Sequence, residues 1–80
     1  MRTAASSELV AFGRTVRKAR RDRDLSQEAL ADEAGLSAKH IGEIERANKD
    51  PRLSTVLKIA RALELTSGEL FAELDERLGA

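Results

Sequence analysis

Apolar residues recur at helical spacing from Ser7 to the end of the chain. In the first segment, Leu9, Phe12 and Val16 follow one another at steps of three and four, which is the spacing of one face of an amphipathic helix that ends near Arg21. The sequence has no run of alternating apolar and polar residues of the kind that predicts a half-buried strand. The pattern therefore predicts an all-α protein, a compact bundle of five helices.

Serine and glycine residues mark where the second and third helices begin and end. Ser26 is a good N-cap for a helix over residues 27–34, and Gly35 ends this helix because glycine adopts the left-handed conformation without a steric cost. Ser37 is then expected to cap a third helix over residues 38–46. This spacing is typical of two short helices that cross about a tight turn.

Two further helices follow a polar loop that contains Pro51, since a proline prevents the chain from simply continuing as helix. A fourth helix is expected from Ser54. Its spacing predicts four buried residues: Val56, Leu57, Ala60 and Leu63. Thr66, with Glu69 three residues later, forms a capping box that opens a fifth helix over residues 67–78.

The composition indicates one small globular domain without a metal or cofactor. Of the 80 residues, 41% are hydrophobic and 35% charged, so we expect a domain over residues 7–80 after a flexible N-terminus of residues 1–6. Cysteine is absent and His40 is the only histidine, which leaves no ligand set for a metal. No membrane span or signal peptide is visible, so we expect a cytoplasmic location. Without a thiol, a tyrosine or a phosphate-binding glycine loop, the chain is not expected to be an enzyme.

Charge is arranged by segment, although the formal net charge is zero. Zero net charge by itself counts against binding to nucleic acid, because neutralising phosphates needs positive charge. Residues 14–23, however, contain six basic residues and one acidic residue, whereas residues 24–34 contain four acidic residues and no basic residue. The net charge therefore hides local patches of both signs.

Five segments resemble a known family in their order and spacing. They are Leu-Ser-Gln-Glu-Ala-Leu-Ala at 25–31, Gly-Leu-Ser at 35–37, Ile-Gly-Glu-Ile-Glu-Arg at 41–46, Pro51, and Ile-Ala-Arg-Ala-Leu at 59–63. The chain resembles the lambda-repressor-like, Cro-type helix-turn-helix family from about Phe12 to Phe71. The resemblance implies that family's five-helix fold, with the helix-turn-helix at the second and third helices.

The same resemblance implies a function. It predicts a transcriptional regulator that binds double-stranded DNA in a sequence-specific manner and associates with the nucleoid when bound. Among proteins of this size, the chain is similar to small phage repressors and to the controller proteins of restriction-modification systems. The chain is too short to include a separate small-molecule effector domain.

The third helix is expected to have two different sides. At about 100° per residue, Ile41 and Ile44 point one way and pack against the domain. The opposite side carries Ala38, Lys39, Gly42, Glu43 and Arg46. In a major groove, Lys39 is expected to donate to guanine and Glu43 to accept from cytosine N4, while Ala38 contacts a thymine methyl group. An ordinary solvated helix face is the alternative, and the resemblance favours direct readout.

The resemblance implies further DNA contacts around this side. Gln27 matches a family position where the side chain and the helix N-terminus meet a phosphate and brace the third helix; the alternative is an exposed helix former. Four polar residues match a loop that reaches backbone phosphates: Arg46, Asn48, Lys49 and Arg52. Ser37 and His40 complete the predicted set at the start of the third helix. Ordinary loop polarity, and solvent exposure of His40, are the corresponding alternatives.

Arg20 and Glu45 match positions that hold a partly buried ion pair in some relatives. Glu45 lies on the packed side of the third helix, where an unpaired carboxylate would be costly. Arg20 lies one turn after Val16, on the inward side of the first helix. We therefore interpret this pair as structural.

Three positions depart from the family pattern, all in the DNA-facing region. Ala47 stands where glycine usually ends the third helix, so Asn48 is expected to adopt the left-handed turn instead. Gly42 replaces a small polar residue and is expected to let the backbone approach the duplex. Glu43 stands where basic or amide residues are frequent, so it needs a specific base or a neighbouring arginine as its partner.

The fifth helix is expected to join two copies into a homodimer. Its apolar stripe consists of Leu70, Phe71, Leu74 and Leu78. The first two match family positions that close the domain's own core, whereas the last two lie beyond it and need a partner to cover them. Two copies would place two reading helices on a palindromic operator. Acidic residues flanking this stripe count against a close contact.

A protein-interaction module is the rival function from a different class. One version is the DNA-binding antitoxin of a toxin pair, and another is a helix-turn-helix that bridges proteins. Antitoxins usually add a disordered toxin-binding tail, and Leu78 is almost the last residue here, which disfavours that version.

Overall fold

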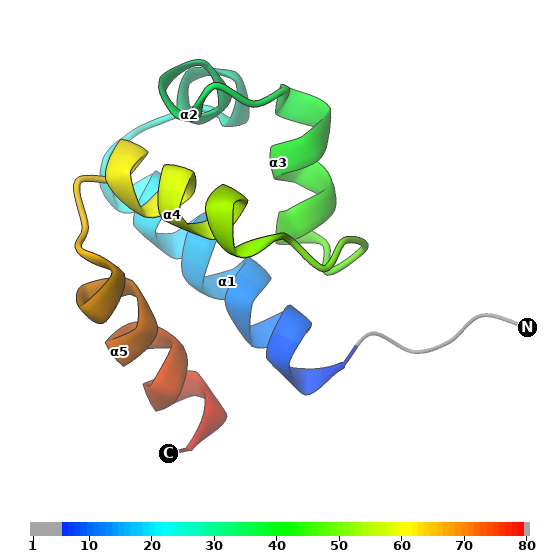
Figure 1. Ribbon diagram of the computed structural model, residues 1–80, viewed down its shortest axis with the longest axis vertical. Helices are drawn as coiled ribbons and strands as arrows, with labels where there is room; N and C mark the ends of the chain where they lie inside the picture. Colours follow the sequence, from blue (N-terminus) through cyan, green and yellow to red (C-terminus); the bar gives the residue numbers. More distant parts are fainter. Residues whose placement is uncertain (1–5, 80) are drawn as a thin grey trace, which may run out of the picture.

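The computed structural model describes residues 6–79. Its elements are α1 (Ser7–Asp22), α2 (Gln27–Ala34), α3 (Ala38–Glu45), α4 (Leu53–Ala62) and α5 (Ser67–Leu78) (Figure 1). The described part contains no strand, and the predicted all-α, five-helix class is confirmed. No helix in the described range is both long and apolar enough to cross a membrane.

One core joins all five helices. Helix α1 lies between α3 and α5, and α4 packs against α2 and against α5 (Figure 1). Each helix contributes one aliphatic side chain with no exposed surface: Val16, Leu30, Ile41, Ile59 and Leu70. Burying such side chains is the main source of stability in so small a domain.

Side-chain caps begin four of the five helices. A hydroxyl oxygen accepts a hydrogen bond from the backbone N–H three residues later at Ser6, Ser26, Ser37 and Thr66. The capping box of Thr66 and Glu69 is confirmed, since both of its hydrogen bonds are present. Ser6 was predicted to belong to the flexible N-terminus; as the N-cap of α1 it is part of the domain. The rest of that predicted segment, residues 1–5, lies outside the described range.

All five helices end in the same way, with a left-handed residue just after the last turn. These residues are Asp24, Gly35, Ala47, Glu64 and Gly79. After α3, Ala47 itself has φ of 61°, so the prediction that Asn48 would adopt this conformation is wrong. The reason is the hydrogen bond from Asn48 N–H to the Glu43 carbonyl oxygen at 2.8 Å, which closes the helix end only if the residue before Asn48 turns left.

The residue that follows the left-handed turn differs after α3. After α1, α2 and α4 it is a leucine that is at least partly buried: Leu25, Leu36 and Leu65. After α3 it is Asn48, which is exposed. The chain therefore returns to the core after three helices but stays at the surface between α3 and α4.

Two helix boundaries and one burial prediction need correction. Helix α3 ends at Glu45, with Arg46 as its C-cap, and α4 begins at Leu53, one residue before the predicted start. Leu57 was predicted to be buried but is 37% exposed. It lies beyond the edge of the buried stripe of α4, which is formed by Val56, Ile59, Ala60 and Leu63.

Candidate nucleic-acid interface

The contact between α1 and the end of α3, which we call the α1–α3 junction, is formed by Gly13, Arg20, Ile44 and Glu45. A Cβ atom built on Gly13 would lie 2.6 Å from the carbonyl oxygens of Ile44 and Glu45, so only glycine allows this approach. Sequence reasoning missed Gly13. The available signal was a glycine inside a helix, next to the apolar stripe, where alanine is intrinsically favoured.

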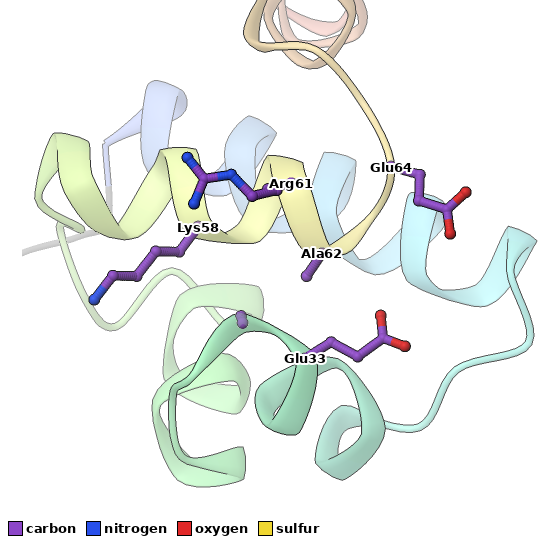
Figure 2. Close-up of a pocket in the computed structure, with 6 residues that line it drawn as sticks. Glu33, Lys58, Arg61, Ala62 and Glu64 are labelled. Atoms are coloured by element: carbon purple, nitrogen blue, oxygen red, sulfur yellow. The ribbon is translucent and has the colours of Figure 1, made fainter.

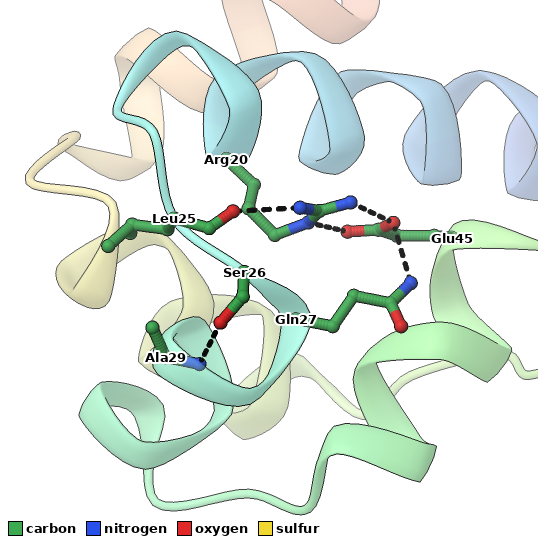
Figure 3. A network of polar contacts seen from close by, with 6 residues as sticks. All are labelled: Arg20, Leu25, Ser26, Gln27, Ala29 and Glu45. Carbon is green, nitrogen blue, oxygen red and sulfur yellow. Dashed lines mark hydrogen bonds and ion pairs between the residues drawn. The ribbon is translucent and has the colours of Figure 1, made fainter.

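The structure brings together Arg20 and Glu45, the pair proposed from the sequence. Arg20 Nε donates to Glu45 Oε2 at 2.7 Å and Nη2 donates to Oε1 at 3.0 Å (Figure 3). The third nitrogen, Nη1, donates to the Leu25 carbonyl oxygen at 2.8 Å. The Glu45 side chain is only 2% exposed, and its hydrogen bonds raise the pKa of Arg20 above the ordinary value. A two-bond pair of this kind fixes the orientation of α3 as well as its position.

Gln27 extends this network to the start of α2. Its Nε2 donates to Glu45 Oε1 at 3.1 Å, so the amide nitrogen faces the junction and not the solvent (Figure 3). Its Oε1 points toward α3, 3.5 Å from where a Cβ of residue 42 would lie. Gln27 therefore links the first turn of α2 to the last turn of α3, in line with the expectation that this position braces the third helix.

The outer face of α3, defined as Ala38, Lys39, Gly42, Glu43 and Arg46, turns away from the junction. Lys39 and Arg46 are exposed, and Ala38 and Glu43 are partly buried. Ser37 is exposed as the N-cap of α3, and His40 is partly buried. Gly42 differs from expectation because it is buried. The Arg46 guanidinium lies over it, so the backbone there is not open to a duplex.

Beside α3 the surface forms a hollow of about 380 Å³, which we call the loop hollow. It is lined by His40, Lys49, Asp50, Pro51, Arg52, Ser54, Thr55 and Lys58. Three Lys and Arg side chains face one carboxylate here, so the hollow suits an anion. Lys58 was missed by the sequence analysis; its signal was its position one turn after Ser54 on the polar side of α4.

A second hollow, of about 230 Å³, lies between α2 and α4. Its charged lining residues are Glu33, Lys58, Arg61 and Glu64, and their charged ends point in different directions (Figure 2). Two carboxylates balance the two cations, so this hollow does not favour a polyanion. Of these two hollows, the loop hollow is therefore the more positive.

The stripe predicted to join two copies divides into three environments. Leu70 has no exposed surface, which removes it from the predicted dimer interface because its own core covers it completely. Leu74 packs partly against the core. Phe71 and Leu78 are 37% and 39% exposed. On α4, Leu53 is 67% exposed, so a second apolar residue lies at the surface besides Leu57.

A family model described as Helix-turn-helix (HTH_3) matches residues 16–70, more than half of the chain, and spans all of α2 and α3. The chain belongs to the helix-turn-helix family. The resemblance stated from the sequence is thereby confirmed.

Proteins with known descriptions are similar to this chain. The chain is 34% identical over 61 residues to the immunity repressor protein of Bacillus phage phi105, covering 76% of this chain and 42% of the repressor. It is 40% identical over 55 residues to the control protein C.SmaI of Serratia marcescens, covering 69% of this chain and 66% of C.SmaI. It is similar in structure to the restriction-modification controller protein C.AhdI from Aeromonas hydrophila, with a TM-score of 0.80, 39% identity, and coverage of 82% and 100%.

Chain lengths differ among these helix-turn-helix relatives. The chain spans 26% and 42% of the length of two curated relatives that it matches. Those relatives are described as a transcriptional regulator and a repressor. These two descriptions apply to proteins that are longer than the matched segment.

Proposed function

We propose that this protein is a sequence-specific transcriptional regulator that places α3 in the major groove of a palindromic double-stranded operator. One observation carries the proposal: within residues 6–79, none of the cations on the outer face of α3 or in the loop hollow forms an ion pair. The cations that do pair are Lys18 and Arg20 of α1 and Arg23, the C-cap of α1. Unpaired cations beside an exposed helix favour a polyanionic partner.

We propose that base recognition comes from the first two turns of α3. Lys39 is exposed at the N-terminal end of the helix, the end that enters the groove in this family of folds. Lys39 donates to guanine and Glu43 accepts from cytosine N4, with Ala38 near a thymine methyl group. Ser37 and His40 flank these contacts at the same end of the helix.

Phosphate contacts are proposed on both sides of the reading residues. Arg46, Asn48, Lys49 and Arg52 are all exposed, and Lys58 joins Lys49 and Arg52 around the loop hollow. Gln27 holds the N-terminus of α2 close to α3, where backbone N–H groups favour an anion. Such contacts set register and affinity, whereas base contacts set specificity.

We propose a homodimer in which a second copy covers the exposed apolar residues of α5. Phe71, Leu74 and Leu78 remain the interface residues, and Leu70 does not. A two-fold axis would place two copies of α3 about one helical turn apart, roughly 34 Å, which matches a palindrome. Sedimentation equilibrium of wild type and Phe71→Glu tests this arrangement, and a monomeric wild type would contradict it.

Because one relative is a phage immunity repressor, repression is the mode of action that we propose.

The experiment that tests sequence-specific binding is selection of binding sites from random duplexes. Wild type is expected to enrich one palindrome. Lys39→Ala or Glu43→Gln is expected to change the preferred base at one position of each half-site, with a change of about 1–3 kcal/mol in the binding free energy that separates the bases there. Lys49→Ala is the matched control and should weaken all sites alike. Enrichment of no sequence would favour the protein-interaction module instead.

A further inference from the structure

Gly42 is a helical glycine on the outer face of α3 that is nevertheless buried. Two side chains cover it. A Cβ atom built at this position would lie 2.9 Å from Arg46 Nη1 and 3.5 Å from Gln27 Oε1. Arg46 is the C-cap of α3, four residues further along the chain, so its guanidinium group turns back over the helix that it ends.

The fold itself does not require glycine at position 42. An added methyl group meets the far end of a flexible, exposed arginine, which moves aside without shifting any backbone. At Gly13 the corresponding neighbours are the carbonyl oxygens of Ile44 and Glu45, which cannot move alone. Packing therefore explains the glycine in α1 but not the glycine in α3.

Glycine at position 42 also makes α3 a poorer helix. Helix α3 has only 8 residues, and a glycine inside a helix is less favourable than alanine. The fold neither needs Gly42 nor gains from it. The reason for a glycine at this position therefore lies with Arg46, whose guanidinium group occupies the space that a side chain at position 42 would fill.

We infer that Gly42 is a positioning residue for Arg46, and that the missing side chain lets the guanidinium lie beside Gln27, where it meets one phosphate of the DNA backbone. Gln27 is itself held by its hydrogen bond to Glu45, so the α1–α3 junction supports this arrangement from below. Arg46 then stands next to the N-terminus of α2, and both favour the same anion. The inference rests on the proposed function. It adds Gly42 as a position that contributes to DNA affinity without itself contacting DNA.

The test compares Gly42→Ala, Arg46→Ala and the double variant on the duplex selected by wild type. Gly42→Ala is expected to raise Tm by about 4–8 °C, because alanine is the better helix former. The same variant should weaken binding about tenfold per half-site at about 0.1 M salt and lower the salt slope by about 1 per half-site. The double variant should bind no more weakly than Arg46→Ala, because both changes remove the same contact.

Gly68→Ala is the matched control. It makes the same chemical change in α5, where a Cβ would meet only Thr66 Oγ1 at 3.8 Å. Its Tm should rise while affinity and salt slope stay at wild-type values. Wild-type affinity of Gly42→Ala, additive losses in the double variant, or a lower Tm would each overturn the inference and leave the proposed function intact. A wild type that binds no duplex would overturn both.

Discussion

Gly13 and Gly42 are both buried glycines in contact with residues of α3, but different kinds of atom bury them. Gly13 meets two backbone carbonyl oxygens at 2.6 Å from its would-be Cβ, on the inner side of α3. Gly42 meets the end of the Arg46 side chain at 2.9 Å, on the outer side. The first contact is rigid, and the second is made by a group that moves.

This difference divides α3 into a side that holds the fold and a side that is free to act. On the inner side, the Arg20 guanidinium and the Glu45 carboxylate form two hydrogen bonds with one another and have little contact with solvent. On the outer side, Lys39 and Arg46 are exposed and form no ion pair within residues 6–79. Substitutions on the inner side should therefore change stability, and those on the outer side should change DNA binding.

The largest expected effect belongs to the outer side and is a steep salt dependence. A dimer that uses Lys39, Arg46, Lys49 and Arg52 on each half-site should neutralise about six to eight phosphates, and lose roughly 10³ to 10⁵ in affinity between about 50 and 200 mM salt. Fluorescence anisotropy of a labelled duplex measures this loss. Lys49→Ala should lower the slope by about 1 per half-site, with the melting curve unchanged. A flat salt response would sink the phosphate assignment.

The inner side is tested most strongly by Arg20→Ala. Removing the guanidinium leaves the Glu45 carboxylate, 2% exposed, without its main partner, so unfolding free energy should fall by about 3–5 kcal/mol. Urea denaturation followed by circular dichroism measures the change.

A double-mutant cycle separates this pair from its surroundings. The combination with Glu45→Ala should cost clearly less than the sum of the single changes, because the second change removes the carboxylate that the first leaves unpaired. Should the alanine variants fail to fold, Arg20→Met and Glu45→Gln give the same cycle with smaller losses. Strict additivity would show that the two groups do not stabilise one another.

Gly13→Ala should have an intermediate effect, opposite in sign to that of Gly42→Ala. The new methyl group meets two carbonyl oxygens of α3, so overpacking should lower the unfolding free energy by about 1–3 kcal/mol. Alanine is the better helix former by about 1 kcal/mol, so any destabilisation reports the close contact between the helices. Equal Tm values for Gly13→Ala and Gly68→Ala would show that α1 and α3 do not approach closely enough at Gly13 to exclude a methyl group.

Helix boundaries near strong local signals could be predicted from the sequence. Ser26 with Gly35, and Thr66 with Glu69, act within a single turn, so the residues themselves carry the information. The Arg20 and Glu45 pair also came from the sequence, but only through resemblance to relatives. Nothing local in the sequence specifies that Arg20 pairs with a residue 25 positions away.

Features that depend on how helices meet were missed or misplaced. Leu57 was placed inside because a shift of one residue on a helix moves a side chain by about 100°, which periodicity over ten residues does not resolve. Leu70 and Phe71 were both expected to close the core as well as to belong to the interface stripe, but Leu70 has no exposed surface whereas Phe71 is 37% exposed. Gly13 and Lys58 depend on the path of another helix or loop, and that path is a tertiary property.

The smallest expected effect comes from Ala47, at the boundary between the two sides of α3. Its φ of 61° is a conformation that costs an L-residue about 1 kcal/mol and costs glycine almost nothing. Ala47→Gly should therefore raise Tm by about 4 °C, a gain reduced by the larger entropy of glycine in the unfolded chain.

Gly35→Ala is the opposite substitution and the control. At φ of 71° its Cβ would meet nothing within 4 Å, so its loss of stability measures backbone strain alone. Because Ala47 precedes the loop that contains Lys49, the salt slope of Ala47→Gly should match wild type if the Asn48 hydrogen bond to Glu43 keeps the loop in place. A changed slope with an unchanged Tm would show instead that the strained turn aims the loop at DNA and contributes little to stability.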